Sequence, residues 1–274
     1  LNGPNPWDMQ INDERLFLDC LLRGTLALGE AYERGWWDAE ALEECFARLV
    51  RARLDERLPN LPRWLARQWS RVSNGQTLRG SKRVAEAHYD LGNDLYERML
   101  DPRMVYTCGW WASARDLSES QKAKLDLSCR KLGLAPGMKV LDIGCGWGSF
   151  ATFAAERYGV EVTGVTISRE QAELARVRSA GLPVDILLQD YRDVRGRFDR
   201  IVSLGMFEHV GHKNHATYLA TVRRLLREDG LFLLHTIGRN DRGAGIDPWV
   251  TRYIFPNSEI PSLERLVASL DHLF

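Results

Sequence analysis

Apolar residues in the first part of the chain recur at the spacing of amphipathic helices. Between about Asn12 and Arg71, two groups share this spacing: Leu16, Phe17, Cys20 and Leu21, then Leu42, Cys45, Phe46, Leu49, Val50 and Leu54. Positions three and four apart lie on one face of a helix, so the pattern predicts a small all-helical domain over residues 1–72. Trp36 and Trp37 follow a glycine there. We expect these two tryptophans either to anchor the core beside a helix end or to face a ligand or lipid.

From residue 84 onward the pattern changes to short apolar runs that alternate with helical periods. Strands are predicted at Lys139–Ile143, Val160–Thr166, Val184–Leu188, Phe198–Ser203 and Leu231–Thr236, and helices at Ser149–Arg157, Ser168–Ser179, Ala216–Leu226 and from about Ser262. Such alternation is typical of a parallel sheet in an α/β fold. A stretch rich in Ser, Asn, Gly, Gln and basic residues precedes it, so we predict a linker at 73–83 and a second domain at 84–274.

Composition excludes several classes of protein. The 274 residues are 45% hydrophobic and contain 37 basic and 37 acidic side chains, so no overall positive charge points to nucleic acid as a partner. The five cysteines lack C-x-x-C spacing, which argues against a zinc ribbon or a disulfide framework and fits a reducing cytoplasm. No apolar run is long enough to span a bilayer.

The most informative motif is the glycine loop, Gly144-Cys145-Gly146-Trp147-Gly148, which joins an apolar strand to a helix. Glycine permits backbone angles closed to other residues and lets a ligand approach the main chain, while the next helix offers unpaired N–H groups. The spacing differs from the dinucleotide G-x-G-x-x-G, and no P-loop lysine follows. Strand, GxGxG and helix resemble the first motif of Rossmann-like S-adenosylmethionine (SAM) methyltransferases. Another nucleotide fold, or a glycine turn needed only for packing, are the alternatives.

Ligand contacts in such folds cluster where parallel strands end. Asp142 precedes the loop and either orients it or satisfies its amides. Thr166 and Gln171 follow the second strand, where the acid that usually binds ribose is absent, although Ser168 with Gln171 also forms an ordinary capping box. Asp190 and Tyr191 follow the third strand and suit an adenine edge and face, or an ordinary turn.

The fourth and fifth strands end in residues that can handle protons. Glu208 and His209 follow the fourth, and His235 ends the fifth. Burial and charge pairing can move their pKa values toward neutrality, but a lone histidine is more often structural. A metal site from these three residues lacks a diagnostic spacing such as H-E-x-x-H, so none is predicted.

Taken together, several motifs resemble the bacterial cyclopropane-fatty-acyl-phospholipid synthases. They are His88-Tyr89-Asp90-Leu91-Gly92-Asn93-Asp94, Tyr106-Thr107-Cys108, Leu141 to Gly148, Gly164 to Ser168, Gly205 to Gly211 and Leu234 to Gly238. The stretch from Leu28 to Trp37 also resembles the helical domain of the phospholipid-modifying branch. The resemblance implies a class I SAM methyltransferase domain preceded by a small helical domain.

The same resemblance implies an activity and a site. The family transfers the SAM methyl group to a cis double bond of a phospholipid acyl chain, and loss of a proton then closes a cyclopropane ring. Matching motifs imply a bicarbonate ion as the base, held by Cys108, Glu208, His235 and the backbone of Ile237. The implied SAM contacts are Tyr106, Thr107, Gly144, Cys145, Gly146, Gly148, Thr166, Gln171, Asp190 and Tyr191.

The resemblance further implies unsaturated phospholipids as partners, a homodimer, and peripheral attachment to the cytoplasmic face of the membrane. The resemblance also implies two departures: Thr107 stands where relatives often have serine, and the tyrosine that completes the bicarbonate site in relatives is expected beyond Phe274. An antiparallel strand pair usually closes the sheet, so we expect the catalytic domain to lack a C-terminal part here. The alternatives are a related methyltransferase that yields a methyl or methylene branch, and a non-catalytic lipid- or SAM-binding module.

Overall fold

The structure is a computed structural model that describes residues 1–52, 92–240, 246–255 and 258–270. It divides into two compact units, Leu1–Asn74 with Gly245–Pro256, and Gly75–Ala244 with Asn257–Phe274. The predicted linker at 73–83 lies outside the described residues. The division differs from the predicted domains at one place, because 245–256 belong with the first unit.

Within residues 1–52, the first unit contains the helices α1 (Arg15–Arg23), α2 (Thr25–Glu33) and α3 (Leu42–Arg51). Gly24, with a φ of 62°, ends α1 in a backbone conformation that favours glycine. Trp37 is fully buried and donates its indole N–H to the carbonyl of Leu28 at 2.9 Å, so it is a core anchor. The expected all-helical domain also contains an antiparallel strand pair, β1 (Gln10–Ile11) and β2 (Trp37–Asp38), too short for periodicity to reveal.

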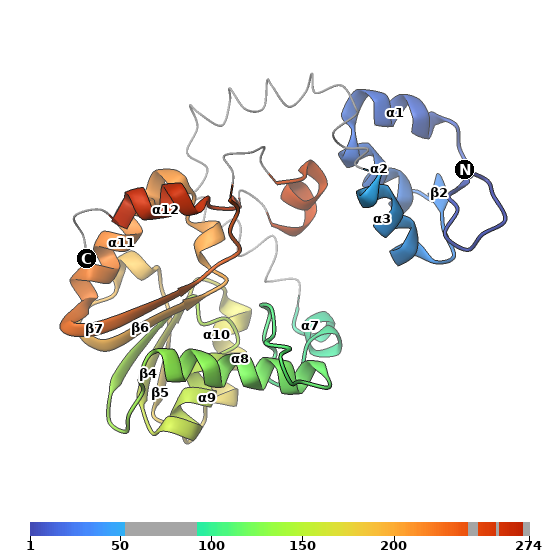
Figure 1. The fold of residues 1–274 in the computed structure, drawn as a ribbon. Coiled ribbons are helices and arrows are strands. Elements are labelled where there is room, and N and C mark those ends of the chain that lie inside the picture. Colours follow the sequence, from blue (N-terminus) through green and yellow to red (C-terminus); the bar gives the residue numbers. More distant parts are fainter. Residues whose placement is uncertain (53–91, 241–245, 256–257, 271–274) are drawn as a thin grey trace. The chain divides into compact units, whose positions relative to one another are not determined.

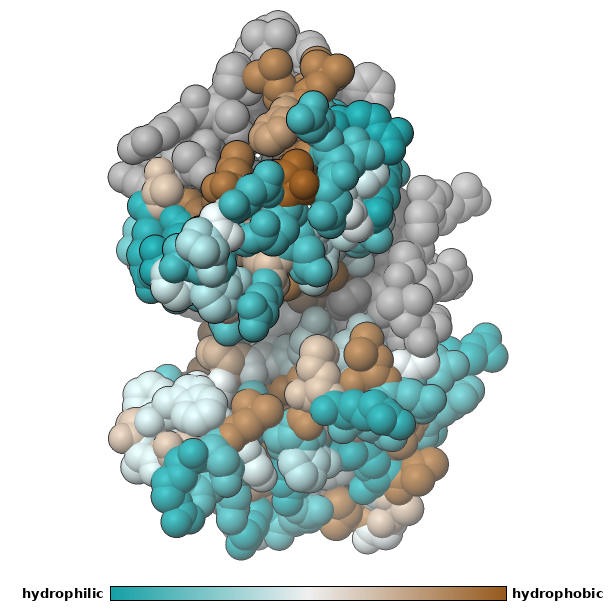
Figure 2. All heavy atoms as spheres, turned by 90° about the vertical axis from the view of Figure 1, so that its right-hand side faces the viewer, coloured by the Kyte–Doolittle hydropathy of each residue, from teal (hydrophilic) through white to brown (hydrophobic). Residues whose placement is uncertain are grey.

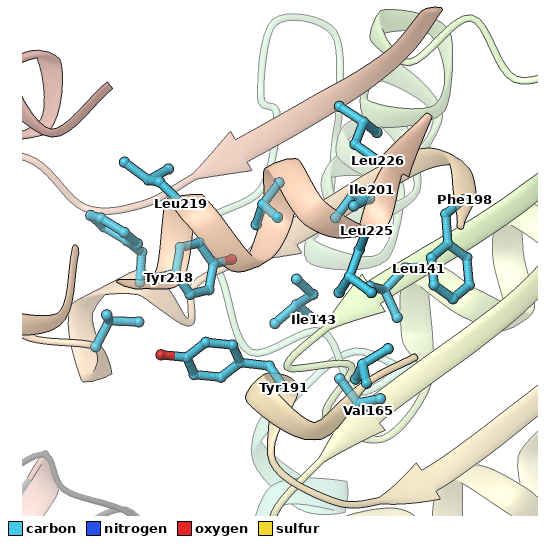
Figure 3. Packing of buried hydrophobic residues seen from close by; sticks show 14 residues of the cluster. Leu141, Ile143, Val165, Tyr191, Phe198, Ile201, Tyr218, Leu219, Leu225 and Leu226 are labelled. Atoms are coloured by element: carbon cyan, nitrogen blue, oxygen red, sulfur yellow. The ribbon is translucent and has the colours of Figure 1, made fainter. Parts of the chain in front are cut away.

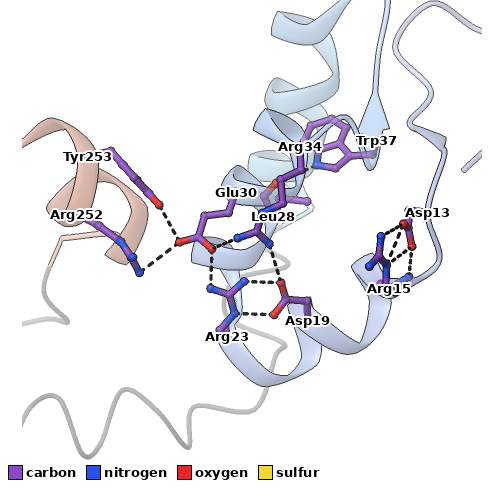
Figure 4. Close-up of polar contacts among 10 residues, drawn as sticks. All are labelled: Asp13, Arg15, Asp19, Arg23, Leu28, Glu30, Arg34, Trp37, Arg252 and Tyr253. Atoms are coloured by element: carbon purple, nitrogen blue, oxygen red, sulfur yellow. Dashed lines mark hydrogen bonds and ion pairs between the residues drawn. The ribbon is translucent and has the colours of Figure 1, made fainter.

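A segment distant in sequence packs on the first unit through a buried carboxylate on α2. Glu30, 4% exposed, accepts a hydrogen bond from the Tyr253 hydroxyl at 2.9 Å and pairs with Arg252 at 3.3 Å (Figure 4). Both residues lie in η5 (Val250–Ile254), a short π-helical turn. Trp249, just before it, donates its indole N–H to Glu33 at 3.2 Å. These contacts are why the segment belongs with the helices.

The second unit contains a five-stranded parallel sheet in the order β5-β4-β3-β6-β7 (Figure 1). The strands are β3 (Lys139–Ile143), β4 (Glu161–Thr166), β5 (Val184–Leu188), β6 (Phe198–Leu204) and β7 (Leu226–His235). The strand order reverses between β3 and β6, where ligands bind in open α/β sheets. Within the described part of the chain, no strand extends this sheet past β7.

Helices cover both faces of this sheet because side chains alternate along each strand. Leu141 and Ile143 of β3 lie in a core cluster with α11 (His215–Leu225), and α12 (Leu263–Leu270) packs on α11 (Figure 3). Val140 of the same strand instead joins a cluster with α8 (Leu117–Lys131) and α9 (Ser149–Tyr158). Asp142 lies two positions along from Val140, so its side chain points to the side of α8.

The remaining described elements are a short helix, a helix that packs on β4 and β5, and three turns that follow β5 and β6 in the sequence. They are α7 (Asp94–Met99), α10 (Arg169–Arg178), and the 3-10 turns η2 (Tyr191–Asp193), η3 (Phe207–His209) and η4 (His212–Asn214). Among the described residues, no helix is both long and apolar enough to cross a membrane.

Hydrophobic side chains nevertheless reach the surface in places, among mostly hydrophilic ones (Figure 2). Exposed large hydrophobic residues include Leu18, Leu21 and Leu22 of α1 and the pair Trp110 and Trp111.

Candidate functional site

The glycine loop adopts a backbone that side chains would disturb. Gly144, Gly146 and Gly148 have φ values of 79°, 55° and 76°. The N–H groups of Gly144 and Cys145 donate to the carbonyl of Val165 at 2.9 and 3.0 Å, which ties the loop to the end of β4. A Cβ at Gly144 would lie 2.6 Å from Cγ of Met206, on the loop after β6. The loop therefore lies directly against the segments that follow β4 and β6, and Gly144 has no room for a side chain.

A cleft opens beside this loop at the carboxyl ends of the strands. Nine of the ten side chains or glycines predicted as SAM contacts line it: Tyr106, Thr107, Gly144, Cys145, Gly146, Thr166, Gln171, Asp190 and Tyr191. Gly148 is the exception. It is the N-cap of α9, and a Cβ there would approach the Cβ of Ala175 in α10 at 3.3 Å, so its small size serves helix packing. The structure thus brings together residues that are up to 85 positions apart in sequence.

The polar residues after β4 have two roles at once. The Thr166 hydroxyl donates to Oε1 of Gln171 at 2.9 Å, and the Ser168 hydroxyl accepts from the Gln171 backbone N–H at 3.3 Å. The N-cap half of the predicted capping box is therefore formed, whereas the Ser168 backbone N–H donates to the Thr166 hydroxyl at 3.3 Å instead of to Gln171. Thr166, Ser168 and Gln171 all still line the cleft.

Asp190 and Tyr191 likewise combine turn chemistry with a place in the cleft. Oδ1 of Asp190 accepts from the backbone N–H of Arg192 at 3.0 Å, which caps η2, and it also pairs with the Arg192 side chain. Tyr191 is 6% exposed and packs edge-on against Tyr218 at 5.1 Å between ring centroids. Burial raises the pKa of the Tyr191 hydroxyl, which keeps it neutral.

The four residues predicted to hold the catalytic ion form two contacts. Sγ of Cys108 lies 3.4 Å from Nε2 of His235, and Oε1 of Glu208 accepts the backbone N–H of Ile237 at 2.6 Å. His235 ends β7 and Ile237 lies two residues later, so the two contacts are adjacent along the chain. Glu208 is 7% exposed, whereas the Ile237 side chain is 62% exposed, consistent with a backbone role.

Two buried polar atoms of this group have no hydrogen-bond partner within the described residues. They are Oε2 of Glu208, which needs a donor, and Nδ1 of His235, which donates or accepts according to its tautomer. A buried polar atom without a partner costs free energy, so such a pair indicates a missing ligand or water.

Sequence reasoning missed Lys124 of α8, which lines the cleft and is 5% exposed. Its Nζ donates to the Thr107 hydroxyl at 2.6 Å, and Nε2 of Gln121 donates to the Thr107 carbonyl at 2.7 Å. A signal was available: Gln121, Lys124 and Ser128 lie at helical spacing on the buried face, where polar residues are uncommon.

Burial changes the pKa values of three ionisable groups in this region. It raises the pKa of Asp142 to about 7, an effect that the Lys124 ammonium opposes. It lowers the pKa of Lys124 to about 8, and it also lowers the pKa of His235, where the positive charge of Lys124 acts in the same direction. His235 therefore tends to be uncharged near neutral pH.

Glu208, His209 and His235 do not gather into a metal site. Across the described ranges, no group of three or more His, Cys, Asp and Glu side chains is arranged to hold a metal ion.

Comparisons with known proteins identify the family of the chain. The family described as "Mycolic acid cyclopropane synthetase" matches residues 76–273. Cyclopropane-fatty-acyl-phospholipid synthase of Escherichia coli strain K12 is 48% identical over 275 residues, covering 100% of this chain and 72% of that protein. A probable fatty acid methyltransferase of Pseudomonas putida is 44% identical over 197 residues, covering 67% of this chain and 50% of that protein.

Solved structures give the same result for the fold. The cyclopropane synthase MmaA2 from Mycobacterium tuberculosis superposes with a TM-score of 0.64 at 36% identity, covering 69% of this chain and 72% of that one. Mycolic acid cyclopropane synthase CmaA1, solved with SAH and CTAB, gives a TM-score of 0.63 at 35% identity, with the same coverages. The predicted fold class, a Rossmann-like class I SAM methyltransferase, is confirmed. The chain belongs to the mycolic acid cyclopropane synthetase family.

Proposed function

We propose that the protein is a cyclopropane-fatty-acyl-phospholipid synthase. The observation that carries this function is the arrangement of Glu208, His235 and Ile237 after β6 and β7, with Cys108 against His235, in the unit that also holds the glycine cleft. A protein that only binds SAM or lipid has no need of a buried carboxylate and imidazole with unpaired atoms. The 48% identity to the E. coli synthase over the whole chain supports the same conclusion.

The atoms and electrons of the proposed reaction balance with SAM, the alkene and a base as the only reactants. The bond between the methyl carbon and sulfur of SAM breaks as one alkene carbon bonds to that methyl, leaving S-adenosylhomocysteine and a carbocation on the other alkene carbon. Loss of a proton from the new methyl group then supplies the electron pair that closes the ring. An alkene is a weak nucleophile, so alignment and exclusion of water must supply much of the acceleration.

The cleft residues suit SAM as the methyl donor. The glycine loop lets the ligand approach the main chain, Thr166 and Gln171 offer hydroxyl and amide groups, and Asp190 and Tyr191 offer a carboxylate and an aromatic face. Tyr106 packs with Tyr96 and Trp147, with ring centroids 5.5 and 6.5 Å away, so an aromatic wall borders the cleft. Aromatic faces attract a sulfonium cation.

Bicarbonate fits the catalytic residues as a bound base. It has both a hydroxyl that can donate to Oε2 of Glu208 and oxygens that can accept from the imidazole or thiol, and these are the kinds of group left unpaired or weakly paired here. When bound, the ion would take up the proton released on ring closure. Glu208 would hold and orient it, and His235 with Cys108 would fix its position.

We further infer that the protein acts on unsaturated phospholipids from the cytoplasmic face of the membrane, as a peripheral protein and a homodimer. The acyl double bond lies inside a bilayer, so a surface must meet lipid. Trp110 and Trp111, 51% and 55% exposed, follow Cys108 within three residues, and tryptophan favours the interface between water and lipid.

Mass spectrometry of the lipid product tests the function. The intact protein would be incubated with SAM and vesicles that carry cis-monounsaturated phospholipids, and the released acyl chains analysed for the position of the added carbon. We expect a gain of one CH₂ with a ring at the former double bond. A methyl or methylene branch would instead identify the related methyltransferase, and SAM binding without any added carbon would contradict an enzyme of either kind.

A second assay tests the ion. Removing bicarbonate from the buffer should slow turnover, and adding it back should restore the rate without changing SAM binding. A rate that is indifferent to bicarbonate would identify a protein side chain as the base.

A further inference from the structure

The contacts of Lys124 set it apart from the other lysines of its helix. Its ammonium is buried in α8 and donates to the Thr107 hydroxyl at 2.6 Å, while Gln121, one turn earlier, donates to the carbonyl of the same Thr107 at 2.7 Å. Both the side chain and the main chain of Thr107 are therefore held by one helix. Burying an ammonium costs free energy of folding, so a buried lysine in this position indicates a role in function.

Thr107 is directly followed by Cys108, whose thiol meets His235 at 3.4 Å. The contact between Cys108 and His235 therefore joins two residues that are held by different elements. On one side is β7, which fixes His235 through its register with Leu204 of β6. On the other side the anchor is α8, acting through Thr107. Removing the anchor would free Cys108, which is itself exposed, to move away from the imidazole.

We propose that Lys124 is a positioning residue of the catalytic site: it holds Thr107 so that Cys108 lies against His235. The inference rests on the proposed function, because Cys108 and His235 are among the residues assigned to proton removal. Lys124 does not touch the reacting atoms and acts through its neighbours.

An uncharged imidazole matters because the reaction already gathers positive charge. The sulfonium of SAM and then the carbocation carry it, and a further cation on His235 would oppose their formation. A neutral imidazole retains one ring nitrogen as a hydrogen-bond acceptor and one as a donor, so it can orient a proton-accepting ion.

The charged groups near Lys124 are negative, whereas those near His235 are positive. Lys124 faces Cys108, Asp101 and Asp142, whose negative forms favour its charge, while burial lowers its pKa to about 8. His235 faces the two cations Lys124 and Lys131, and burial together with these charges lowers its pKa. The ammonium is thus charged at neutral pH and weakly charged above pH 8.

Three variants of the intact protein separate positioning from bulk structure. Lys124→Met removes the charge and the hydrogen bond but keeps an unbranched chain in the buried space, and Lys124→Arg keeps the charge. Lys122→Met is the matched control, because Lys122 lies on the same helix and is exposed. Each is assayed for SAM affinity, for kcat on unsaturated phospholipid vesicles, and for the titration of His235 by NMR with labelled histidine.

We expect Lys124→Met to lose roughly 10- to 100-fold in kcat with SAM affinity within about threefold, because a misplaced group costs that order of rate. The pKa of His235 should rise in Lys124→Met, return toward the wild-type value in Lys124→Arg, and stay unchanged in Lys122→Met. A large loss of SAM affinity with kcat retained would make Lys124 a SAM ligand and overturn the proposal, as would an unchanged His235 titration.

A pH titration of the wild-type protein tests the same coupling and does not depend on whether a variant folds. The chemical shifts of His235 should show a second inflection near pH 8, where Lys124 loses its charge. Absence of that inflection would contradict the electrostatic coupling. Because this titration needs no lipid, its result is separate from the lipid assay: a wild-type protein that forms no cyclopropane would refute the proposed function. The loss of the inflection in Lys124→Met assigns it to Lys124 and not to Asp142, whose pKa is about 7.

Discussion

Glu208 and Ile237 are joined by a hydrogen bond of 2.6 Å, in which the backbone N–H after β7 donates to the carboxylate after β6. The backbone carbonyl of Glu208 in turn accepts the N–H of Glu259 at 2.8 Å. The acid is therefore held through both its side chain and its main chain. One carboxylate oxygen is used in this way, and the other stays available within a buried site. Such fixed geometry is what a group that orients a proton acceptor requires.

Replacing Glu208 with glutamine tests that interpretation. The amide oxygen can still accept the Ile237 N–H, so the fold and SAM binding should persist, while the negative charge and proton affinity are lost. Because Glu208 is proposed to orient the ion that acts as the base, we expect kcat to fall by up to the usual contribution of a general base, roughly 100- to 10,000-fold. Product formation by mass spectrometry and SAM binding by calorimetry give the two readouts.

The matched control for that variant is Glu228→Gln, because Glu228 is an exposed glutamate of β7. It should keep wild-type turnover. If Glu208→Gln also turned over at the wild-type rate, Glu208 would have no part in the proton transfer.

The glycine loop gives a second prediction. Gly146 lies in the cleft with a φ of 55°, so Gly146→Val would place a branched side chain in a strained backbone at the ligand surface, at a cost of about 1–3 kcal/mol for the strain alone. We expect SAM binding to be lost. Gly181→Val carries a similar strain, with a φ of 82°, in an exposed turn away from the cleft, and should keep SAM affinity. Equal affinities by calorimetry would show that the loop is not the cradle.

The sequence was sufficient for the strands and for most of the cleft. Apolar runs bounded by turn residues placed β3 and β5 at their observed limits, because both strands are short and well bounded. β7 starts at Leu226 instead of Leu231, since the charged residues before Gly230 hide its first half and a register shift in β6 separates the two halves. Local periodicity cannot report pairing that depends on a bulge.

Contacts that depend on tertiary structure were beyond the sequence. Nothing in the local pattern indicates that Lys124 meets Thr107, 17 residues earlier, or that Tyr253 meets Glu30, 223 residues away. Helical spacing places Lys124 on one face with Gln121 and Ser128, but only the fold shows that this face, or the face of α2 that carries Glu30, is buried. The residues proposed to hold the ion were predicted from their motifs, whereas the residues that support them were not.

Glu30 supports a third prediction. Its carboxylate meets Arg23 at 2.7 Å and Arg34 at 3.2 Å as well as Arg252, so Glu30→Ala leaves several arginines without their common partner (Figure 4). Because these arginines are partly exposed, we expect a loss of roughly 1–3 kcal/mol in the free energy of unfolding. Hydrogen exchange in residues 246–255 should rise, because Tyr253 loses its acceptor.

Glu43→Ala is the control for this variant, since Glu43 is exposed on α3. It should change neither quantity by much. Unchanged exchange of 246–255 in Glu30→Ala would show that the segment is held by other contacts, such as the close approach of Trp249 to Gly29.

His215 gives a prediction about pH. It is 2% exposed and stacks on Phe207 at 4.3 Å between centroids, and burial lowers its pKa to about 4. In the unfolded chain its pKa is near 6.5, so above that pH both states are neutral and His215 contributes no pH dependence. As the pH falls from about 6.5 to 4, the unfolded state binds a proton that the folded state does not, and the free energy of unfolding decreases.

His215→Phe keeps the stacked ring and removes this titration. Urea unfolding at a series of pH values should therefore show a shallower decline over that interval in the variant than in the wild type. Groups such as Asp142 titrate in both proteins and cancel in the comparison. Parallel declines in the two proteins would mean that His215 is not held neutral in the folded state.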